Sequence, residues 1–205
     1  IDMQLRSNTG NSLAEFAVVI LLMAVLTGGG YVRYSQATER GRAKKSHETI
    51  NKIAMAANNF FHQTNNVEGI GRFPGQEKWN RNVPDSGDTT AAGYASVADA
   101  LQDLADGKFE TYRDGNTFGN KWCSVFGKQN LKATILSEHA NKLHPDDDGL
   151  NNGPAEWADF IDVMESPYLD GHYIYTVIGG NTDKRPAIII TDLFSPSADF
   201  IVFQP

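Results

Sequence analysis

The feature that most constrains this chain is an unbroken apolar run near its beginning. The run extends from Phe16 to Leu26 and reads FAVVILLMAVL. As a helix, the stretch 11–32 that contains it would measure about 33 Å at about 1.5 Å per residue, close to the ~30 Å of a bilayer core. We therefore expect this stretch to be buried in lipid or among the helices of other subunits.

A short polar motif precedes the apolar run. Gly10 is followed by Asn11, three further residues, Glu15 and Phe16. A carboxylate at the edge of an apolar helix costs about 2.5–3.5 kcal/mol on insertion scales, so Glu15 needs a partner. The order of glycine, four residues, glutamate, aromatic residue and apolar segment resembles the processing site of type IV pilins and pseudopilins.

This resemblance implies that a prepilin peptidase cuts after Gly10, removes the leader-like segment 1–10 and leaves Asn11 as the new N-terminus. The new α-amine of an incoming subunit could pair with Glu15 of an assembled one and set the axial register of stacked helices. Phe16 and the residues after it would supply the buried surface. Alternatively, Glu15 lies at the headgroup level and caps the helix start, where the helix dipole favours a negative charge.

Three consecutive glycines interrupt the end of the apolar stretch. Gly28, Gly29 and Gly30 each disfavour a helix by about 1 kcal/mol relative to alanine, so we predict a break or unwound segment there. Beyond them, Ile50, Ile53 and later apolar residues recur at spacings of three and four. This pattern predicts an amphipathic continuation over 33–61, packed on the domain that follows.

The remainder, 62–205, is predicted to be a globular head domain. Short helices are expected at 97–104 and 155–164, after turn-rich segments. Strands rich in β-branched and aromatic residues are expected at 172–178, 187–191 and 200–203, and their short loops favour antiparallel pairing. The fold class is therefore α+β: a long N-terminal hydrophobic helix packed on a small C-terminal antiparallel sheet, with a long irregular connecting region, as in type IV pilins.

Composition excludes several kinds of chemistry. With 18 basic and 25 acidic residues, the net charge is −7, so no nucleic-acid partner is expected. A single cysteine, Cys123, excludes an intramolecular disulfide and a multi-cysteine metal site, and we expect it to be a core residue. No catalytic motif is present, and an enzyme is not predicted.

One acidic segment could hold a cation. Asp146, Asp148 and Asn151 crowd hard oxygen ligands around Gly149, a pattern that suits Ca²⁺. The spacing fails the EF-hand pattern because no glutamate falls at the twelfth position. The alternative is a hydrated turn that caps the next helix, and no other cofactor is expected.

The resemblance favours a structural subunit of an extracellular type IV pilus-like filament. Such a subunit is held in the cytoplasmic membrane and then assembled with copies of itself on the cell surface by a pilus assembly machinery. Two other functions stay open. A pseudopilin of a type II secretion system has the same N-terminal design, and a single-pass membrane-anchored binding module would use 11–32 only as an anchor.

Overall fold

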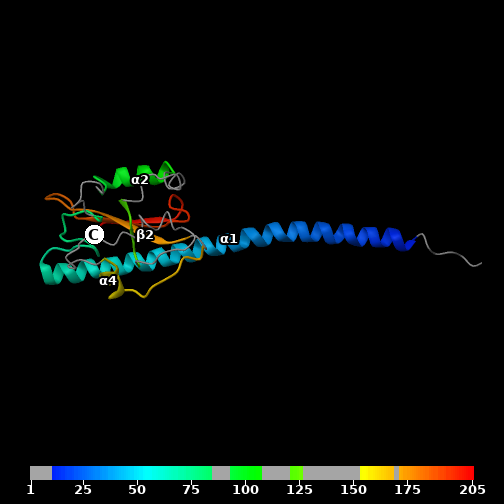
Figure 1. Ribbon diagram of the computed structural model, residues 1–205, viewed down its shortest axis with the longest axis horizontal. Helices are drawn as coiled ribbons and strands as arrows, with labels where there is room; N and C mark the ends of the chain where they lie inside the picture. Colours follow the sequence, from blue (N-terminus) through cyan, green and yellow to red (C-terminus); the bar gives the residue numbers. More distant parts are fainter. Residues whose placement is uncertain (1–10, 85–92, 108–120, 127–152, 169–170) are drawn as a thin grey trace, which may run out of the picture. The chain divides into compact units, whose positions relative to one another are not determined.

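The computed structural model describes residues 11–84, 93–107, 121–126, 153–168 and 171–205, with the side chains of 11–15, 25–33 and Pro154 outside the description. The chain divides into two compact units, Ile1–Arg42 and Ala43–Pro205. The second unit contains the described core. Figure 1 identifies the elements by label and colour.

Helix α1 (Asn11–Glu68) is the longest element and belongs to both units. It passes through Gly28–Gly30 without interruption, so the predicted helix break is wrong for this chain. Glycine weakens a helix through backbone entropy but, unlike proline, keeps its N–H donor, and the flanking residues carry the helix across. Across the described residues, no helix is both long enough and apolar enough to cross a bilayer.

Within the second unit, α1 buries one stripe and ends at a glycine. Ile50, Ile53, Ala57 and Phe61 are almost fully buried, which confirms the predicted core contact of this stripe. Gly69 follows with a φ of 83°, a left-handed conformation that glycine adopts without a steric penalty, and its N–H donates to Asn65 O over 3.1 Å. The helix thus extends seven residues beyond the predicted end at 61.

A four-stranded antiparallel sheet lies against α1. Its strands, in spatial order, are β1 (Cys123–Ser124), β2 (Tyr173–Ile178), β3 (Ala187–Asp192) and β4 (Phe200–Phe203). The register pairs Tyr175 with Ile190 and Ile190 with Ile201. The antiparallel sheet and its three predicted strands are confirmed, and the α+β class is correct.

Side chains alternate between the two faces of the sheet. Tyr173, Tyr175 and Val177 face α1 and α4 (Gly153–Ala158), whereas Ile174 and Ile178 face α2 (Val97–Ala105). The second unit therefore has three layers, with the sheet in the middle, as Figure 1 shows. Because both faces of β2 and β3 are covered, every residue of these two strands is buried.

The bounds of the two short helices were predicted with different accuracy. Helix α2 is confirmed within one residue, and its N-cap Ser96 accepts a hydrogen bond from the Asp99 N–H. Helix α4 is shorter than predicted and begins two residues earlier. The N–H groups of Phe160 and Ile161 both donate to Trp157 O, and this turn ends the helix. An acidic residue such as Asp159 is also unfavourable at a helix C-terminus, because the helix dipole is negative there.

Candidate functional site

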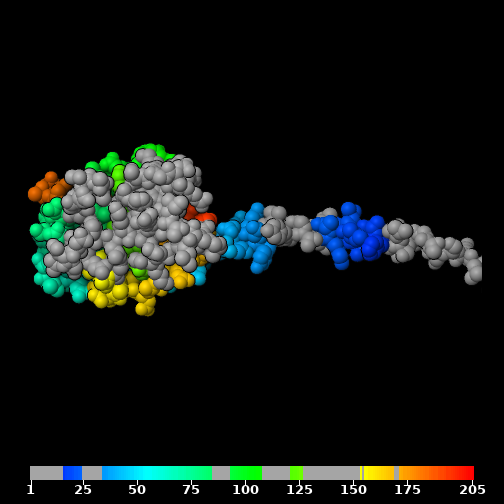
Figure 2. Space-filling view, viewed as in Figure 1, coloured from blue at the N-terminus to red at the C-terminus, as the bar shows by residue number. Residues whose placement is uncertain are grey.

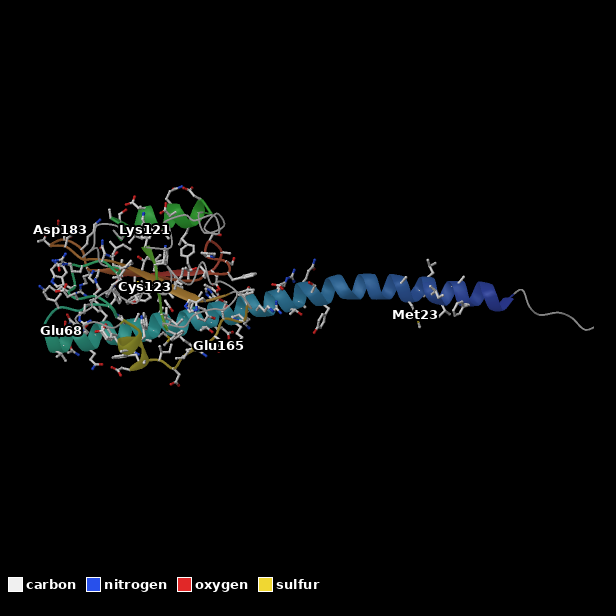
Figure 3. The ribbon with its side chains drawn as sticks, in the orientation of Figure 1. Met23, Glu68, Lys121, Cys123, Glu165 and Asp183 are labelled. Atoms are coloured by element: carbon white, nitrogen blue, oxygen red, sulfur yellow. The ribbon has the colours of Figure 1, made fainter. Side chains whose placement is uncertain are left out.

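The apolar segment of α1 is exposed over its described residues. Phe16, Leu21 and Leu22 are 65%, 64% and 56% exposed, and Val18, Val19 and Ile20 lie in the same segment at about half exposure. All residues of 16–24 are exposed, and nine successive residues at about 100° per residue point in every direction around a helix. This segment has no polar side to turn toward water. Met23 is labelled within it in Figure 3.

The predicted processing and assembly residues are described only in part. Gly10 lies outside the described residues. Asn11 and Glu15 belong to the first turns of α1, but their side chains lie outside the description, so their roles stay predictions. Phe16 is exposed, as an assembly residue in a single chain would be.

The predicted calcium ligands cannot be placed. Asp146, Asp148 and Asn151 all lie outside the described residues. Among the described residues, no group of three or more histidine, cysteine, aspartate or glutamate side chains could hold a metal ion. Calcium binding stays a prediction.

A buried carboxylate joins α1 to the sheet. Asp192, at the end of β3, is fully buried, and its Oδ2 accepts hydrogen bonds from Ser46 Oγ at 2.9 Å and Ser166 Oγ at 2.6 Å. Its Oδ1 accepts from the N–H groups of His172 and Phe194 at 3.2 and 3.0 Å. Burial raises the pKa of Asp192, and these hydrogen bonds oppose the rise. The five residues form the Asp192 cluster.

A second polar cluster lies at the C-terminal end of α1. Arg72 donates to Glu156 Oε1 over 2.7 Å and to both carboxylate oxygens of Glu68 over 3.0 and 3.1 Å. Its guanidinium lies over the ring of Phe60, and Glu156 also accepts from the Gly75 N–H. Burial raises the pKa of Glu156, while Gly75 and Arg72 act against that rise. This cluster connects α1, the segment after it and α4.

A serine and a histidine meet in the core. Ser124 Oγ lies 2.5 Å from His172 Nε2, and Asp192 Oδ1 accepts a hydrogen bond from the backbone N–H of His172. Ser124 is 2% exposed and His172 9%, so the pair is covered by protein and positioned to bind β1 to β2. Cys123, beside Ser124, is also buried in the core as predicted.

A pocket of about 380 Å³ opens where α1 ends. The C-terminal turns of α1, the segment 69–71, Trp79 and the β2–β3 turn line it, the last over Asn181–Pro186. Figure 3 labels Glu68 and Asp183 at this same end of the second unit, and in Figure 2 the β2–β3 turn (orange) stands at the surface. The pocket belongs wholly to the second unit.

Sequence reasoning missed this pocket and the two polar clusters. Each brings together residues that are far apart in the chain: Ser46 and Asp192 are separated by 146 positions, and Arg72 and Glu156 by 84. One signal was present: the Asn181-Thr182-Asp183-Lys184-Arg185 run between two apolar strands is a polar turn with three charges. A turn of this kind marks a surface loop but does not say what lies across from it.

No protein-family model matches this chain, and neither a curated protein nor a solved structure matches it. The exposed apolar segment, the polar clusters and the pocket therefore have to be interpreted from their own residues and geometry.

Proposed function

We propose that this chain is a structural subunit of an extracellular type IV pilus-like filament, packed through the first part of α1. The observation that carries the proposal is the contrast within α1. Its apolar segment is exposed on every side, whereas residues from Ile50 to Phe61 bury one stripe against an antiparallel sheet. A helix that is apolar all round belongs in the interior of an assembly or in lipid.

Copies of the same helix are the proposed partners of the apolar segment. In a filament, Phe16, Leu21 and Leu22 of one subunit exchange water or lipid contacts for contacts with neighbouring helices. Each fully buried side chain of this size contributes about 1.5–3 kcal/mol, so several such residues per subunit support a stable polymer. The second unit then faces outward and carries the filament surface.

Glu15 sets the register in this proposal. A peptidase cut after Gly10 produces an α-amine at Asn11, and that amine pairs with Glu15 of a neighbouring subunit. Within a helix bundle that excludes water, an unpaired carboxylate is strongly unfavourable, so only the register that pairs the two charges is stable. Before assembly, the subunit is held at the cytoplasmic membrane, and an assembly machinery extracts it.

The substitution Glu15→Ala tests the proposal in the native source. Filament formation is expected to fall to a few per cent of wild type, because the register-setting pair is lost while the apolar surface is kept. The matched control is Glu39→Ala, which removes an exposed acid of the same helix whose ion pair with Arg42 contributes little. Filaments are counted by electron microscopy, and the subunit is quantified in the membrane fraction.

Three results would contradict the proposal. Wild-type filament numbers with Glu15→Ala would remove the register mechanism. An intact mass that still includes 1–10 in assembled or surface-exposed protein would show that no cut follows Gly10. A subunit that never forms filaments but stays membrane-bound and active in ligand binding would instead favour the anchored binding module.

A further inference from the structure

The β2–β3 turn is rigid where it borders the pocket. Asn181 Oδ1 accepts hydrogen bonds from the N–H groups of Asp183 and Lys184, each over 2.9 Å, and the Asn181 N–H donates to Lys184 O over 2.8 Å. The carbonyl of Arg185 accepts from Gln204 Nε2 over 3.0 Å. The backbone that presents Arg185 is therefore fixed from both sides, which lowers the entropic penalty of binding.

Trp79 forms an aromatic wall of the pocket. A Cβ built on Gly180 would lie 2.7 Å from the indole, so the ring packs directly on the backbone of this glycine. The Gly180 N–H also donates to Trp79 O over 2.8 Å. Trp79 is thus held in place by a contact that only glycine allows, and it is partly exposed toward the pocket.

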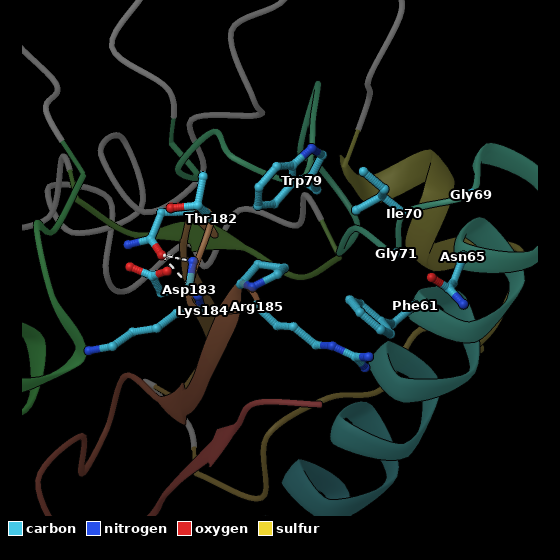
Figure 4. A pocket seen from close by; sticks show the side chains of 12 residues that line it. Phe61, Asn65, Gly69, Ile70, Gly71, Trp79, Thr182, Asp183, Lys184 and Arg185 are labelled. Carbon is cyan, nitrogen blue, oxygen red and sulfur yellow. Dashed lines mark hydrogen bonds between the residues drawn. The ribbon is translucent and has the colours of Figure 1, made fainter.

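Arg185 extends into the pocket and has no carboxylate partner among the described residues. Figure 4 shows its side chain directed toward α1 near Phe61, whereas Lys184 points the opposite way. Within the described part of the chain, no hydrogen bond or ion pair involves the guanidinium of Arg185, in contrast to Arg72 and its two glutamates. A guanidinium is a planar fork that binds a carboxylate through two parallel hydrogen bonds.

Further polar groups on the pocket lining are also available. The side chains of Asn65, Thr182 and Asp183 make no hydrogen bond to another described residue. Of these, Asn65 lies beside Phe61 and Ile70 on the α1 side toward which Arg185 extends, and its amide offers both donors and an acceptor, whereas Thr182 and Asp183 lie on the other side of the turn. A ligand that fits Trp79, Arg185 and Asn65 together has an apolar face, one negative charge and a hydroxyl within reach of the amide.

We propose that this pocket binds a carboxylated sugar of the uronic acid class. The C–H face of the sugar ring lies on Trp79, the carboxylate pairs with Arg185, and a ring hydroxyl bonds to Asn65 on the α1 side of the pocket. A plain carboxylate would leave Trp79 and Asn65 unused, and a neutral sugar would offer no charge to the Arg185 guanidinium. A volume of about 380 Å³ falls within the range of roughly 300–1,000 Å³ that is typical of small-ligand sites.

Charge supports an acidic ligand at this place. Of the charged residues on the pocket lining, Arg185 directs its guanidinium toward α1, whereas Lys184 points the opposite way. The whole chain has a net charge of −7. An anion that reaches the pocket meets the Arg185 guanidinium on an otherwise acidic protein.

The test is a titration of the full chain, held in a detergent without a sugar headgroup, with methyl glucuronide. The probe signal is the indole N–H resonance of Trp79, because Trp122 and Trp157 are fully buried. Saturable shifts of this resonance are expected with methyl glucuronide. The neutral methyl glucoside is expected to bind about tenfold more weakly or worse, because its ring is the same but the charged hydrogen bonds are missing.

Two variants locate the binding. Arg185→Gln is expected to weaken methyl glucuronide binding about tenfold or more. Lys184→Gln removes the same charge one residue away but from a side chain that points out of the pocket, and it is expected to weaken binding by less than about threefold. The mass, folding and detergent load of the two variants are directly comparable.

The proposal is overturned by any of four results. These are no saturable shift with methyl glucuronide, equal affinity for methyl glucoside, equal affinity for sodium acetate, or equal losses with Arg185→Gln and Lys184→Gln. Equal affinity for acetate would identify a general anion site. The filament proposal does not depend on any of these outcomes, because no pocket residue belongs to the apolar segment.

Discussion

At the scale of single residues, Asp192 shows how one carboxylate organises the second unit. Its two oxygens accept four hydrogen bonds, one from α1, two from the segment before β2 and one from the turn after β3. A buried carboxylate is stable only when such donors surround it. Ser46 brings α1 into this arrangement, so a single serine fixes where along α1 the sheet packs.

The substitution Asp192→Asn is expected to alter how the free energy of unfolding depends on pH, compared with the wild type. Burial raises the pKa of Asp192 above its ordinary value of 3.8, so the folded state favours the protonated form. The contribution of Asp192 to the free energy of unfolding is fully present below pH 3.8. It is lost as the pH rises through the pKa that Asp192 has in the folded state. Asparagine is neutral throughout, so the free energy of unfolding of the variant, minus that of the wild type, should increase between pH 4 and pH 7.

The increase should be about 1.4 kcal/mol for each unit by which the native pKa is raised. Urea unfolding followed by tryptophan fluorescence at several pH values gives the difference. Glu156→Gln is the companion variant, because burial also raises the pKa of Glu156 and the sign should be the same. A difference that is constant or falls with pH would show that the carboxylate of Asp192 is fully compensated in the fold.

At the scale of elements, α1 combines residues with opposite helix preferences. It contains Gly28–Gly30 and, further on, a stripe held in the core at Ile50, Ile53 and Phe61. Packing supports the second part of the helix, whereas glycine weakens the first. The stability of a single helix is therefore expected to vary along its length.

Hydrogen exchange across α1 tests this expectation. Amides near the glycine run should exchange much faster than those of 46–61, and Gly29→Ala should slow exchange over 27–33 about fivefold, the equivalent of about 1 kcal/mol. Gly41→Ala is the matched control, since nothing lies within 4 Å of a Cβ built there. It should slow exchange near position 41 only. Equal protection at the glycine run and at 46–61 would mean that the glycines do not weaken the helix.

Sequence patterns predicted most of the elements but not what joins them. The strands at 173–178, 187–192 and 200–203 are dense in β-branched and aromatic residues, and α2 has a serine N-cap and a clear apolar period. By contrast, β1 has only two residues and exists because β2 offers it a partner at Ile174 and Tyr175. Neither the two polar clusters nor the pocket has a local pattern, because each forms only when distant segments meet.

At the scale of the whole molecule, the described core and the exposed apolar segment belong to different units. The two core clusters contain only residues from Ile50 onward, and the segment 16–24 contributes nothing to them. Folding of the second unit and association of the chain are therefore separable. The two properties can be tested on one truncated chain.

A fragment that begins at Gln36 should keep the fold and lose self-association. It retains all core residues and two turns of α1 before Ser46, so its cooperative thermal unfolding should match that of the full chain in detergent. Sedimentation equilibrium without detergent should show a monomer for the fragment and large assemblies for the full chain. A full chain that stays monomeric, or a fragment that aggregates to the same extent, would contradict an association through the apolar segment.

The buried position of Cys123 makes its alkylation rate a measure of how often the fold opens. Its thiol is 1% exposed and lies in the two-residue strand β1 at the edge of the sheet. An alkylating reagent can react only when β1 leaves β2 or when the core opens, because the thiolate must reach the solvent. The rate of labelling therefore reports these openings in a monomer, in a detergent micelle or in an assembled filament, without an engineered cysteine.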